Sequence, residues 1–296
     1  MFLLLDSGHL VHQLWHFANA KNKREGRPDG EVDPDDVLDW YLIKLDHLRE
    51  YTNSLRGRMV ERGYMTADIH LIAAFDSGKS NRKKIVDDYK GHREKKADSL
   101  YVALNEAPRA LEYSSEWTAV TAPDGWECDD AIATLAYRAQ IAGHRSIIHS
   151  IDKDFNQCLV PGMVSIIKES RAEPAELNDF GIPIRDELKV RTYTAQDYLE
   201  EWGFPIDRWV DYQAMVGDSA DNIQGCVGVG PKTAQAILQE WPTTPLEAIP
   251  LVKILDQLNK RQAANWPAFI DRINELRFLL TLRTNLEIGA DLLCLD

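Results

Sequence analysis

The chain has 296 residues, 44% hydrophobic and 27% charged, which is typical of a globular protein of about two domains. Its longest apolar runs, Phe2–Leu5 and Phe278–Leu280, are far shorter than the ~18 residues of a membrane-spanning helix, and no basic region precedes the first run. These features exclude a disordered, fibrous or membrane-spanning chain, and we expect no secretion signal.

The four cysteines, Cys128, Cys158, Cys226 and Cys294, are isolated, with no Cys-x-x-Cys pair among them. The sequence therefore predicts neither a cysteine-based zinc site nor a redox motif. We expect a reducing, cytoplasmic compartment.

The charge is unevenly distributed. The chain carries 34 basic and 47 acidic residues, a net charge of −13 that by itself argues against a nucleic-acid partner. Residues 79–96, however, contain eight basic and three acidic residues. This stretch is either a solvated basic helix face or a surface that binds an anionic substrate.

Three short apolar runs predict buried parallel strands, and an aspartate ends each run or directly follows it. They are Phe2–Leu5 before Asp6, Leu71–Phe75 before Asp76, and Ser146–Ile151 before Asp152. Helical patterns at 37–55 and 130–142 lie between the strands. This alternation predicts an α/β fold, a central and mostly parallel sheet with helices on both faces.

The pattern changes near residue 190. Four helices are predicted beyond it, at 195–202, 208–216, 232–241 and 271–282, separated by glycine and proline. We therefore predict an α/β domain over 1–190 and a helical domain over 191–296. Residues 21–36 are polar and are expected to form an exposed loop.

The strand-ending aspartates predict a metal site, because ligands of an open parallel sheet bind beyond the carboxyl ends of its strands. Together with the acidic start of the helix near 130, seven carboxylates should surround one cavity: Asp6, Asp76, Glu127, Asp129, Asp130, Asp152 and Asp154. So many anions require a counter-charge, and an all-oxygen set favours Mg²⁺ or Mn²⁺. Two such ions suit phosphodiester hydrolysis. Taken singly, each aspartate is more often a turn or cap residue, and residues 127–130 could only complement the helix dipole.

Two other motifs are incomplete. Asp152 begins a calcium-loop pattern, but Gln157 and Met163 replace its required Gly and Glu. Gly78 lies where a phosphate-binding loop would end, but Ala73 replaces its first Gly. An EF-hand is therefore excluded, and a nucleoside triphosphatase fits the sequence poorly.

A glycine turn precedes the helix predicted at 232–241. Gly228 and Gly230 let backbone amides approach a phosphate, and Lys232 and Thr233 open the helix, as in a helix-hairpin-helix over 217–241. Such a turn is otherwise an ordinary helix connection. Just upstream, Asp218 and Asp221 would join the carboxylates if the helical domain packs on the sheet edge.

These motifs together resemble the 5′-nuclease superfamily of flap endonucleases and 5′-3′ exonucleases, which includes the N-terminal nuclease domain of bacterial DNA polymerase I. The matching segments lie, in order, at 3–9, 74–76, 89–93, 125–136, 152–157, 217–222 and 228–234. The spacing between Asp6 and Asp76 and the polar stretch at 169–191 depart from the family pattern.

The resemblance implies a PIN-like fold with two metal ions. Asp6, Asp76, Glu127 and Asp129 would hold the first ion, and Asp129, Asp152, Asp154 and Asp221 the second, with Asp130 and Asp218 in the outer shell. Lys90 and Arg93 would grip the scissile phosphate at the base of a helical arch formed near 79–110. A potassium ion at the helix-hairpin-helix would bridge to duplex phosphate. The remaining predicted DNA contacts are Arg82, Lys83, Lys84, Tyr89, Gly228, Gly230, Lys232 and Thr233.

The expected activity is Mg²⁺-dependent hydrolysis of DNA near 5′ ends, flaps, nicks or branched junctions by a monomer, with Mn²⁺ as a substitute ion. Two alternatives are open. One is a catalytically idle protein of the same fold that binds branched DNA. The other is a ribonuclease of the related single-domain fold, which the C-terminal helical half disfavours.

Overall fold

The computed structural model describes residues 1–28, 30–61, 68–78, 80–86, 88–91, 96–113, 116–169 and 190–289. A six-stranded sheet lies at its centre, with the strand order β3-β2-β1-β4-β5-β6. The strands are β1 (Phe2–Asp6), β2 (His70–Phe75), β3 (Trp117–Thr121), β4 (Ser146–His149), β5 (Val164–Glu169) and β6 (Val190–Tyr193). All pairs are parallel except β5–β6.

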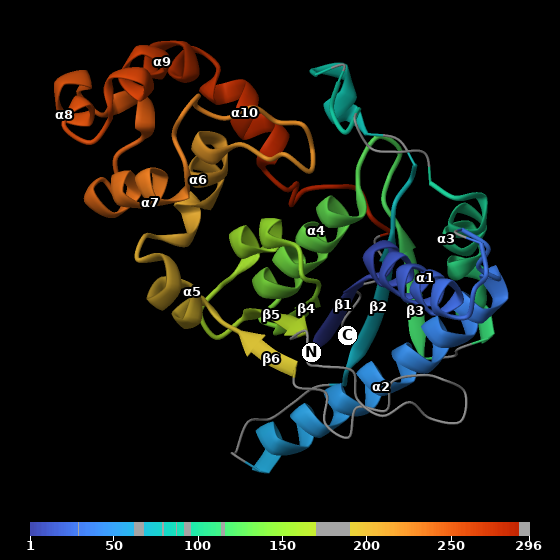
Figure 1. Ribbon diagram of the computed structural model, residues 1–296. Coiled ribbons are helices and arrows are strands. Elements are labelled where there is room, and N and C mark those ends of the chain that lie inside the picture. The colour runs from blue at the N-terminus through green and yellow to red at the C-terminus, as the bar shows by residue number, and fades with distance from the viewer. Residues whose placement is uncertain are drawn as a thin grey trace.

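Helices cover both faces of the sheet, as predicted (Figure 1). On one face α1 (Ser7–Arg24), α2 (Pro34–Glu61) and α3 (Asp98–Ala110) pack against alternate strand residues such as Leu3 and Leu5. On the other face α4 (Cys128–Ile141) packs against Phe2, Leu4 and Ile148. The alternation follows from the two-residue period of a strand. The predicted α/β class is confirmed.

The second half of the chain is helical. It contains α5 (Ala195–Trp202), α6 (Trp209–Val216), α7 (Pro231–Glu240), α8 (Leu251–Leu255), α9 (Lys260–Asp271) and α10 (Ile273–Leu280). The four predicted helices correspond to α5, α6, α7 and α10, whereas the sequence pattern does not predict α8 and α9. The described residues also form short 3₁₀ helices: η1 (Asn81–Lys84), η2 (Leu111–Tyr113), η3 (Lys153–Cys158), η4 (Ile206–Arg208) and η5 (Leu246–Ala248).

One apolar core joins the sheet to the C-terminal helices, since Phe2, Ile148, Trp209 and Leu276 belong to the same buried cluster. The end of the chain also returns to the first half. Arg138 on α4 donates to the carbonyl oxygens of Leu286 (2.6 Å) and Ile288 (2.8 Å). The division predicted after residue 190 thus runs through a continuous core, and it stays a prediction.

The exposed loop predicted over residues 21–36 is wrong at both ends. Helix α1 continues to Arg24, where Lys21, Lys23 and Arg24 complement the negative end of its dipole. Helix α2 begins at Pro34, a residue well suited to a first helical position. No described helix is long and apolar enough to cross a membrane.

Gly217 and Gly225 lie close together in a tight loop between α6 and α7, and this loop carries Asp218 and Asp221. Gly217 adopts φ 80° and ψ 174°, a conformation that essentially only glycine adopts. A Cβ on Gly217 would lie 2.5 Å from the backbone nitrogen of Gly225 and 2.6 Å from the carbonyl oxygen of Ile223. The loop therefore requires glycine at position 217.

We expect Gly217→Ala to lower the free energy of unfolding by about 3 kcal/mol or more, because backbone atoms of the loop must move. The matched control is Gly143→Ala. Gly143 also has a positive φ, of 79°, but nothing lies within 4 Å of its Cβ position. The Gly143→Ala replacement should lower the free energy of unfolding by only about 1–2 kcal/mol. Urea unfolding measures both, and equal losses would contradict the assignment.

Candidate metal centre

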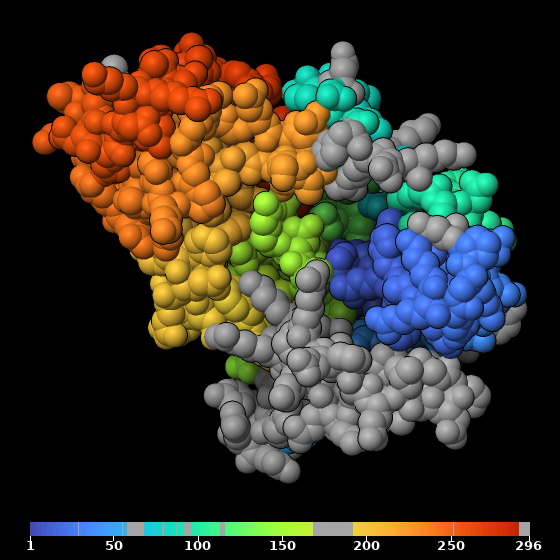
Figure 2. All heavy atoms as spheres, viewed as in Figure 1, coloured from blue at the N-terminus to red at the C-terminus, as the bar shows by residue number. Residues whose placement is uncertain are grey.

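The predicted carboxylates gather at the carboxyl edge of the sheet. Asp6 ends β1, and Asp76 directly follows β2. After β4, Asp152 lies just before η3 and Asp154 lies within it. Asp129 lies in the first turn of α4. In the space-filling view this edge is a recess between the blue atoms of α1 and the orange C-terminal half, with green atoms at its floor (Figure 2).

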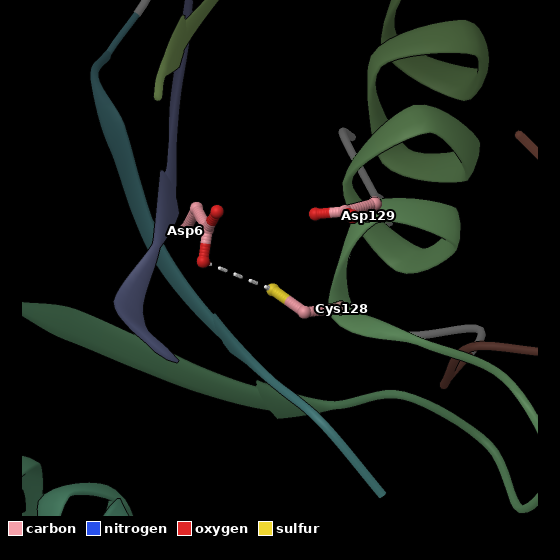
Figure 3. Close-up of side chains that lie close together, drawn as sticks. All are labelled: Asp6, Cys128 and Asp129. Atoms are coloured by element: carbon pink, nitrogen blue, oxygen red, sulfur yellow. Dashed lines mark hydrogen bonds between the residues drawn. The ribbon is translucent and has the colours of Figure 1, made fainter. Parts of the chain in front are cut away.

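Asp6, Cys128 and Asp129 form the tightest part of the cluster. One ligand atom from each lies within 4.8 Å of the other two, and the side chains converge from β1 and from the start of α4 (Figure 3). The Sγ atom of Cys128 lies 3.9 Å from Oδ1 of Asp6. Nothing in the sequence points to Cys128 at this site, because an isolated cysteine carries no ligand spacing.

Hydrogen bonds fix the orientation of Asp6. Its Oδ1 accepts from the backbone N–H of His9 at 2.9 Å and so caps α1, while Oδ2 accepts from the hydroxyl of Ser150 at 3.3 Å. Asp76 accepts from the backbone N–H of Cys128 at 2.8 Å, which links β2 to the start of α4. The carboxylates are thus held in place by the chain itself.

Burial and mutual repulsion raise the pKa of three of these carboxyl groups. Burial is the largest cause for each. Together with Asp76 and Asp152 it raises the pKa of Asp6 to about 6. Burial, followed by the negative charges of Asp6 and Asp152, raises the pKa of Asp129 well above its usual range. Burial and the charge of Asp152 raise the pKa of Asp154 to about 7. The chain therefore holds together carboxylates that repel one another.

The donor chemistry of this cluster fits hard divalent cations. Within the described parts of the chain, no lysine or arginine forms an ion pair with Asp6, Asp76, Asp129, Asp152 or Asp154. Carboxylate oxygens are the ligands that Mg²⁺ and similar ions prefer. Divalent cations would supply the direct counter-charge that no ion pair of the described residues gives these five carboxylates.

Asp218, from the helical half, reaches the same edge. It is 6% exposed, and the Nζ atom of Lys153 lies 3.2 Å from its Oδ2. Gln213 of α6 donates a hydrogen bond to Oδ1 of Asp154. The helical half therefore packs directly on the strand ends, as the prediction for Asp218 and Asp221 required.

Glu127, Asp221 and Lys90 form the rim of the site. The Nζ atom of Lys90 lies 2.6 Å from Oε1 of Glu127 and 3.6 Å from Oδ2 of Asp221. Both carboxylates also lie within hydrogen-bond distance of the Tyr89 hydroxyl, at 3.0 and 2.8 Å. Tyr89 is only 2% exposed, so the prediction that it contacts DNA is wrong; it bridges two carboxylates instead.

The same rim joins two distant segments through their backbones. The N–H of Lys90 donates to the carbonyl oxygen of Asp221 at 3.1 Å, and Asn222 donates to the side chain of Asp88 at 2.7 Å. Lys90 (φ 56°) and Asn222 (φ 59°) both adopt left-handed conformations that are uncommon for residues other than glycine. Unusual backbone is thus concentrated where the two halves meet beside the carboxylates.

Arg82 was predicted to contact DNA, but it is 3% exposed and lies beneath the site. Its guanidinium donates to both carboxylate oxygens of Asp130, at 2.7 and 2.8 Å, and to Oε2 of Glu127 at 2.8 Å. Asp130 is fully buried and also accepts from the backbone N–H groups of Glu127 and Arg283. Arg82 therefore cannot reach a DNA backbone, and the oxygens of Asp130 are occupied by protein donors.

The other predicted DNA contacts are exposed lysines on η1 and α7 and the residues of the glycine turn before α7. Lys83 and Lys84 are exposed on η1, and Lys232 is exposed at the start of α7. Gly228 (φ 87°) forms an exposed turn that Gly230 and Thr233 continue into α7. Lys79 and Arg93 lie outside the described residues.

The raised pKa values predict how the metal-free protein responds to pH. A carboxyl group whose pKa is raised by folding binds protons more tightly in the folded state, so lowering the pH from 8 towards 5.5 should stabilise the metal-free protein through Asp6 and Asp154. Asp154→Asn should raise the melting temperature at pH 8 by about 2–4 °C, and it should weaken the further stabilisation by MgCl₂ that we expect for the wild type. Thermal unfolding in EDTA and in MgCl₂ measures both effects.

The control for Asp154→Asn is Asp256→Asn, an exposed carboxyl on the helical half. It should leave the pH and Mg²⁺ responses unchanged. A destabilised Asp154→Asn protein at pH 8 without metal would contradict the repulsion described above.

Replacement of Arg82 tests the buried ion pair. Arg82→Ala leaves Asp130 buried without a cation, and we expect a loss of about 3–5 kcal/mol of unfolding free energy. Arg49→Ala removes an exposed pair with Glu116, also 2.8 Å long, and should lower the free energy of unfolding far less, because water screens the pair. Urea unfolding at pH 7 compares the two, and similar losses would show that burial of the pair is not decisive.

Comparison with known proteins identifies the family. Residues 1–203 match the model of the 5′-3′ exonuclease N-terminal resolvase-like domain, and residues 204–295 match the model of the 5′-3′ exonuclease C-terminal SAM fold. Over 298 residues the chain is 30% identical to DNA polymerase I of Rhizobium leguminosarum, covering 99% of this chain but 25% of that protein. It thus spans about a quarter of the polymerase's length.

A shorter relative supports the same family, and a solved structure shares the fold. Flap endonuclease Xni of Photorhabdus laumondii is 33% identical over 229 residues, which is 74% of this chain and 80% of that protein. The flap endonuclease of bacteriophage T5, solved as a pseudo-enzyme-product complex with DNA and metal ions, shares the fold with a TM-score of 0.61 at 16% identity, over 96% of this chain and 89% of that chain. The chain therefore belongs to the 5′-3′ exonuclease family.

Proposed function

We propose that the protein is a divalent-metal-dependent nuclease that hydrolyses DNA near 5′ ends or at junctions of single and double strand. The observation that carries the proposal is the crowded set of carboxylates at the sheet edge, of which Asp6, Asp76, Asp129, Asp152 and Asp154 form no ion pair with a described lysine or arginine. The names of the relatives, a flap endonuclease and a DNA polymerase I, support a DNA substrate.

The carboxylates divide into two overlapping sets around Asp129. We assign Asp6, Asp76 and Glu127 with Asp129 to one ion, and Asp152, Asp154 and Asp221 with Asp129 to a second; Asp218, paired with Lys153, supports the second from outside. Asp130, whose oxygens accept protein N–H groups, holds Glu127 from behind. Mg²⁺ is the ion we propose, with Mn²⁺ as a substitute. When bound, such ions stabilise negative charge on a reacting phosphate.

Lys90 places a positive charge at the rim of the site, where an anionic substrate would approach, and Tyr89 contacts the carboxylates beside it. The Lys90 ammonium beside Glu127 and Asp221 is partly exposed, at the rim where a phosphate would approach the carboxylates. Burial and the two carboxylates raise the pKa of Tyr89, which keeps its hydroxyl protonated as a donor to one or the other of them. We propose that Lys90, together with Arg93, stabilises charge on the scissile phosphate.

The basic surfaces on either side would hold the DNA. Lys83 and Lys84 project from η1 beside the site, and the turn at 228–230 offers backbone N–H groups at the start of α7. We further propose a potassium ion at this turn, a monomeric protein and a cytoplasmic location. The alternative of an idle DNA-binding protein is not favoured, because the relatives are nucleases.

Asparagine replacements test the metal assignment. Asp129→Asn and Asp154→Asn remove one negative charge each with little change in volume, and each should lower cleavage of a labelled 5′-flap substrate in Mg²⁺ by at least about 100-fold. The matched control, Asp256→Asn, should cleave at the wild-type rate. Product ladders from a 5′ flap, a nicked duplex and a single strand, in DNA and RNA forms, would define the substrate. Wild-type rates in both site variants would refute the proposal.

A further inference from the structure

The thiol of Cys128 lies among the carboxylates of the metal centre. The side chain is 3% exposed, and its Sγ atom is 3.9 Å from Oδ1 of Asp6. The backbone N–H of the same residue donates to Oδ1 of Asp76 at 2.8 Å. Cys128 is therefore held beside the ends of two strands, through its side chain at β1 and through its backbone at β2.

The Asp129 carboxylate, from the next residue of α4, points into the same space (Figure 3). One ligand atom from each of Asp6, Cys128 and Asp129 lies within 4.8 Å of the other two. In the described parts of the chain, neither of the two carboxylates forms an ion pair. One sulfur and two oxygen ligands, from two different elements, thus converge on one space.

The separations of these ligand atoms suit a single ion. Zn²⁺ binds cysteine sulfur at about 2.3 Å and carboxylate oxygen at about 2.0–2.2 Å, so two of its ligand atoms are at most about 4.5 Å apart. The 3.9 Å between Sγ of Cys128 and Oδ1 of Asp6 is within that limit. The 4.8 Å bound on the whole set exceeds the limit by only about 0.3 Å. Little rearrangement is needed for the three groups to close on one ion.

The thiol changes which ions this set of ligands prefers. Mg²⁺ prefers oxygen ligands, whereas a thiolate is a soft ligand that selects ions such as Zn²⁺. One sulfur and two carboxylates give three protein ligands and leave the fourth position of a tetrahedral ion open. Cys128 therefore adds to the oxygen ligands one that Mg²⁺ does not favour and that thiophilic ions do.

We infer that Cys128 makes the metal centre a binding site for thiophilic divalent cations, with Zn²⁺ or Cd²⁺ held by Sγ of Cys128 together with Asp6 and Asp129. The ion replaces the thiol proton, which passes to solvent, and no group changes its oxidation state. Because Asp6 and Asp129 are also assigned to Mg²⁺, the thiophilic ion excludes Mg²⁺ and stops cleavage. This last step rests on the proposed function, whereas binding of the thiophilic ion does not.

Cadmium absorption tests the inference without DNA. Cd²⁺ is titrated into the metal-free full chain, and the ultraviolet sulfur-to-cadmium charge-transfer band is recorded. Every protein carries Cys294→Ser, because Cys294 lies outside the described residues. The parent protein should give a band that saturates at one ion per chain, and added MgCl₂ should move its midpoint to higher Cd²⁺ concentration. Cys128→Ser and Cys128→Ala should abolish the band, and Asp129→Asn should weaken Cd²⁺ binding at least about tenfold.

The matched control is Cys226→Ser. Cys226 is also 3% exposed, but burial alone raises the pKa of its thiol, to about 11, with no contribution from a carboxylate. This variant should keep the full band. No band in the parent protein, a band retained by Cys128→Ala, a band lost in Cys226→Ser, or a parent midpoint that does not respond to MgCl₂ would each overturn the inference. The MgCl₂ measurement needs no cysteine 128 variant, so the inference is tested even if circular dichroism shows those variants to be misfolded.

Cleavage of a labelled 5′ flap separates the inference from the proposed function. In Mg²⁺, the Zn²⁺ concentration that halves the rate should be at least about tenfold higher for Cys128→Ser than for the parent, each compared with its own rate without Zn²⁺. Equal concentrations would contradict the exclusion of Mg²⁺ through Cys128. A parent protein that cleaves no substrate in Mg²⁺ would refute the proposed function and leave the cadmium result intact.

Discussion

The buried ion pair between Arg82 and Asp130 is the interaction on which the geometry of the site depends. Arg82 joins η1, the start of α4 and the end of α10, since it donates to Asp130, to Glu127 and to the carbonyl oxygen of Leu279 at 2.8 Å. Two charges removed from water are costly unless every donor and acceptor is satisfied, and here Asp130 accepts four N–H groups. The pair thereby fixes the first turn of α4, which carries Cys128 and Asp129.

The carboxylates at the sheet edge, in contrast, lower the stability of the metal-free protein, because burial and mutual repulsion disfavour their charged forms. Burial and the negative charges of neighbouring carboxylates, Asp152 among them for all three, raise the pKa values of Asp6, Asp129 and Asp154. A site organised in this way before its counter-ions arrive needs little rearrangement when they bind. Local instability at the edge is compatible with a stable protein because a continuous core, extending from Phe2 to Ile288, lies beneath it.

The sequence predicts those parts of the fold that local patterns determine. Each strand that an aspartate ends or follows, β1, β2 and β4, is predicted because a central parallel strand is a short apolar run. Strand β3 is not, since it lies at a sheet edge with only Trp117 and Val120 buried, and β6 is not, because it is a short edge strand that pairs antiparallel with β5. Helix α9 contains Pro267, which disfavours a helical prediction. Helix α1, in contrast, buries Leu10, Val11, Trp15 and Ala18 at helical spacing, a signal that is present in the sequence.

For the site, sequence patterns locate the carboxylates but not their partners. The role of Arg82 depends on Asp130, 48 residues away, and on the carbonyl oxygen of Leu279, 197 residues away, so its place in a basic stretch suggests a surface contact instead. Tyr89 is similar: its hydroxyl meets Asp221 across 132 residues of sequence. Such assignments follow from the tertiary packing of distant segments, and no periodicity encodes them.

Three of the carboxylates also stand at the N-cap position before a helix: Asp6 before α1, Glu127 before α4 and Asp152 before η3. Helix capping and ion coordination thus draw on the same oxygens. Asparagine satisfies a helix start about as well as aspartate, whereas alanine does not. At positions 6 and 152, alanine scanning would therefore confuse a frayed helix with a missing ligand, and only the amide replacement separates architecture from chemistry.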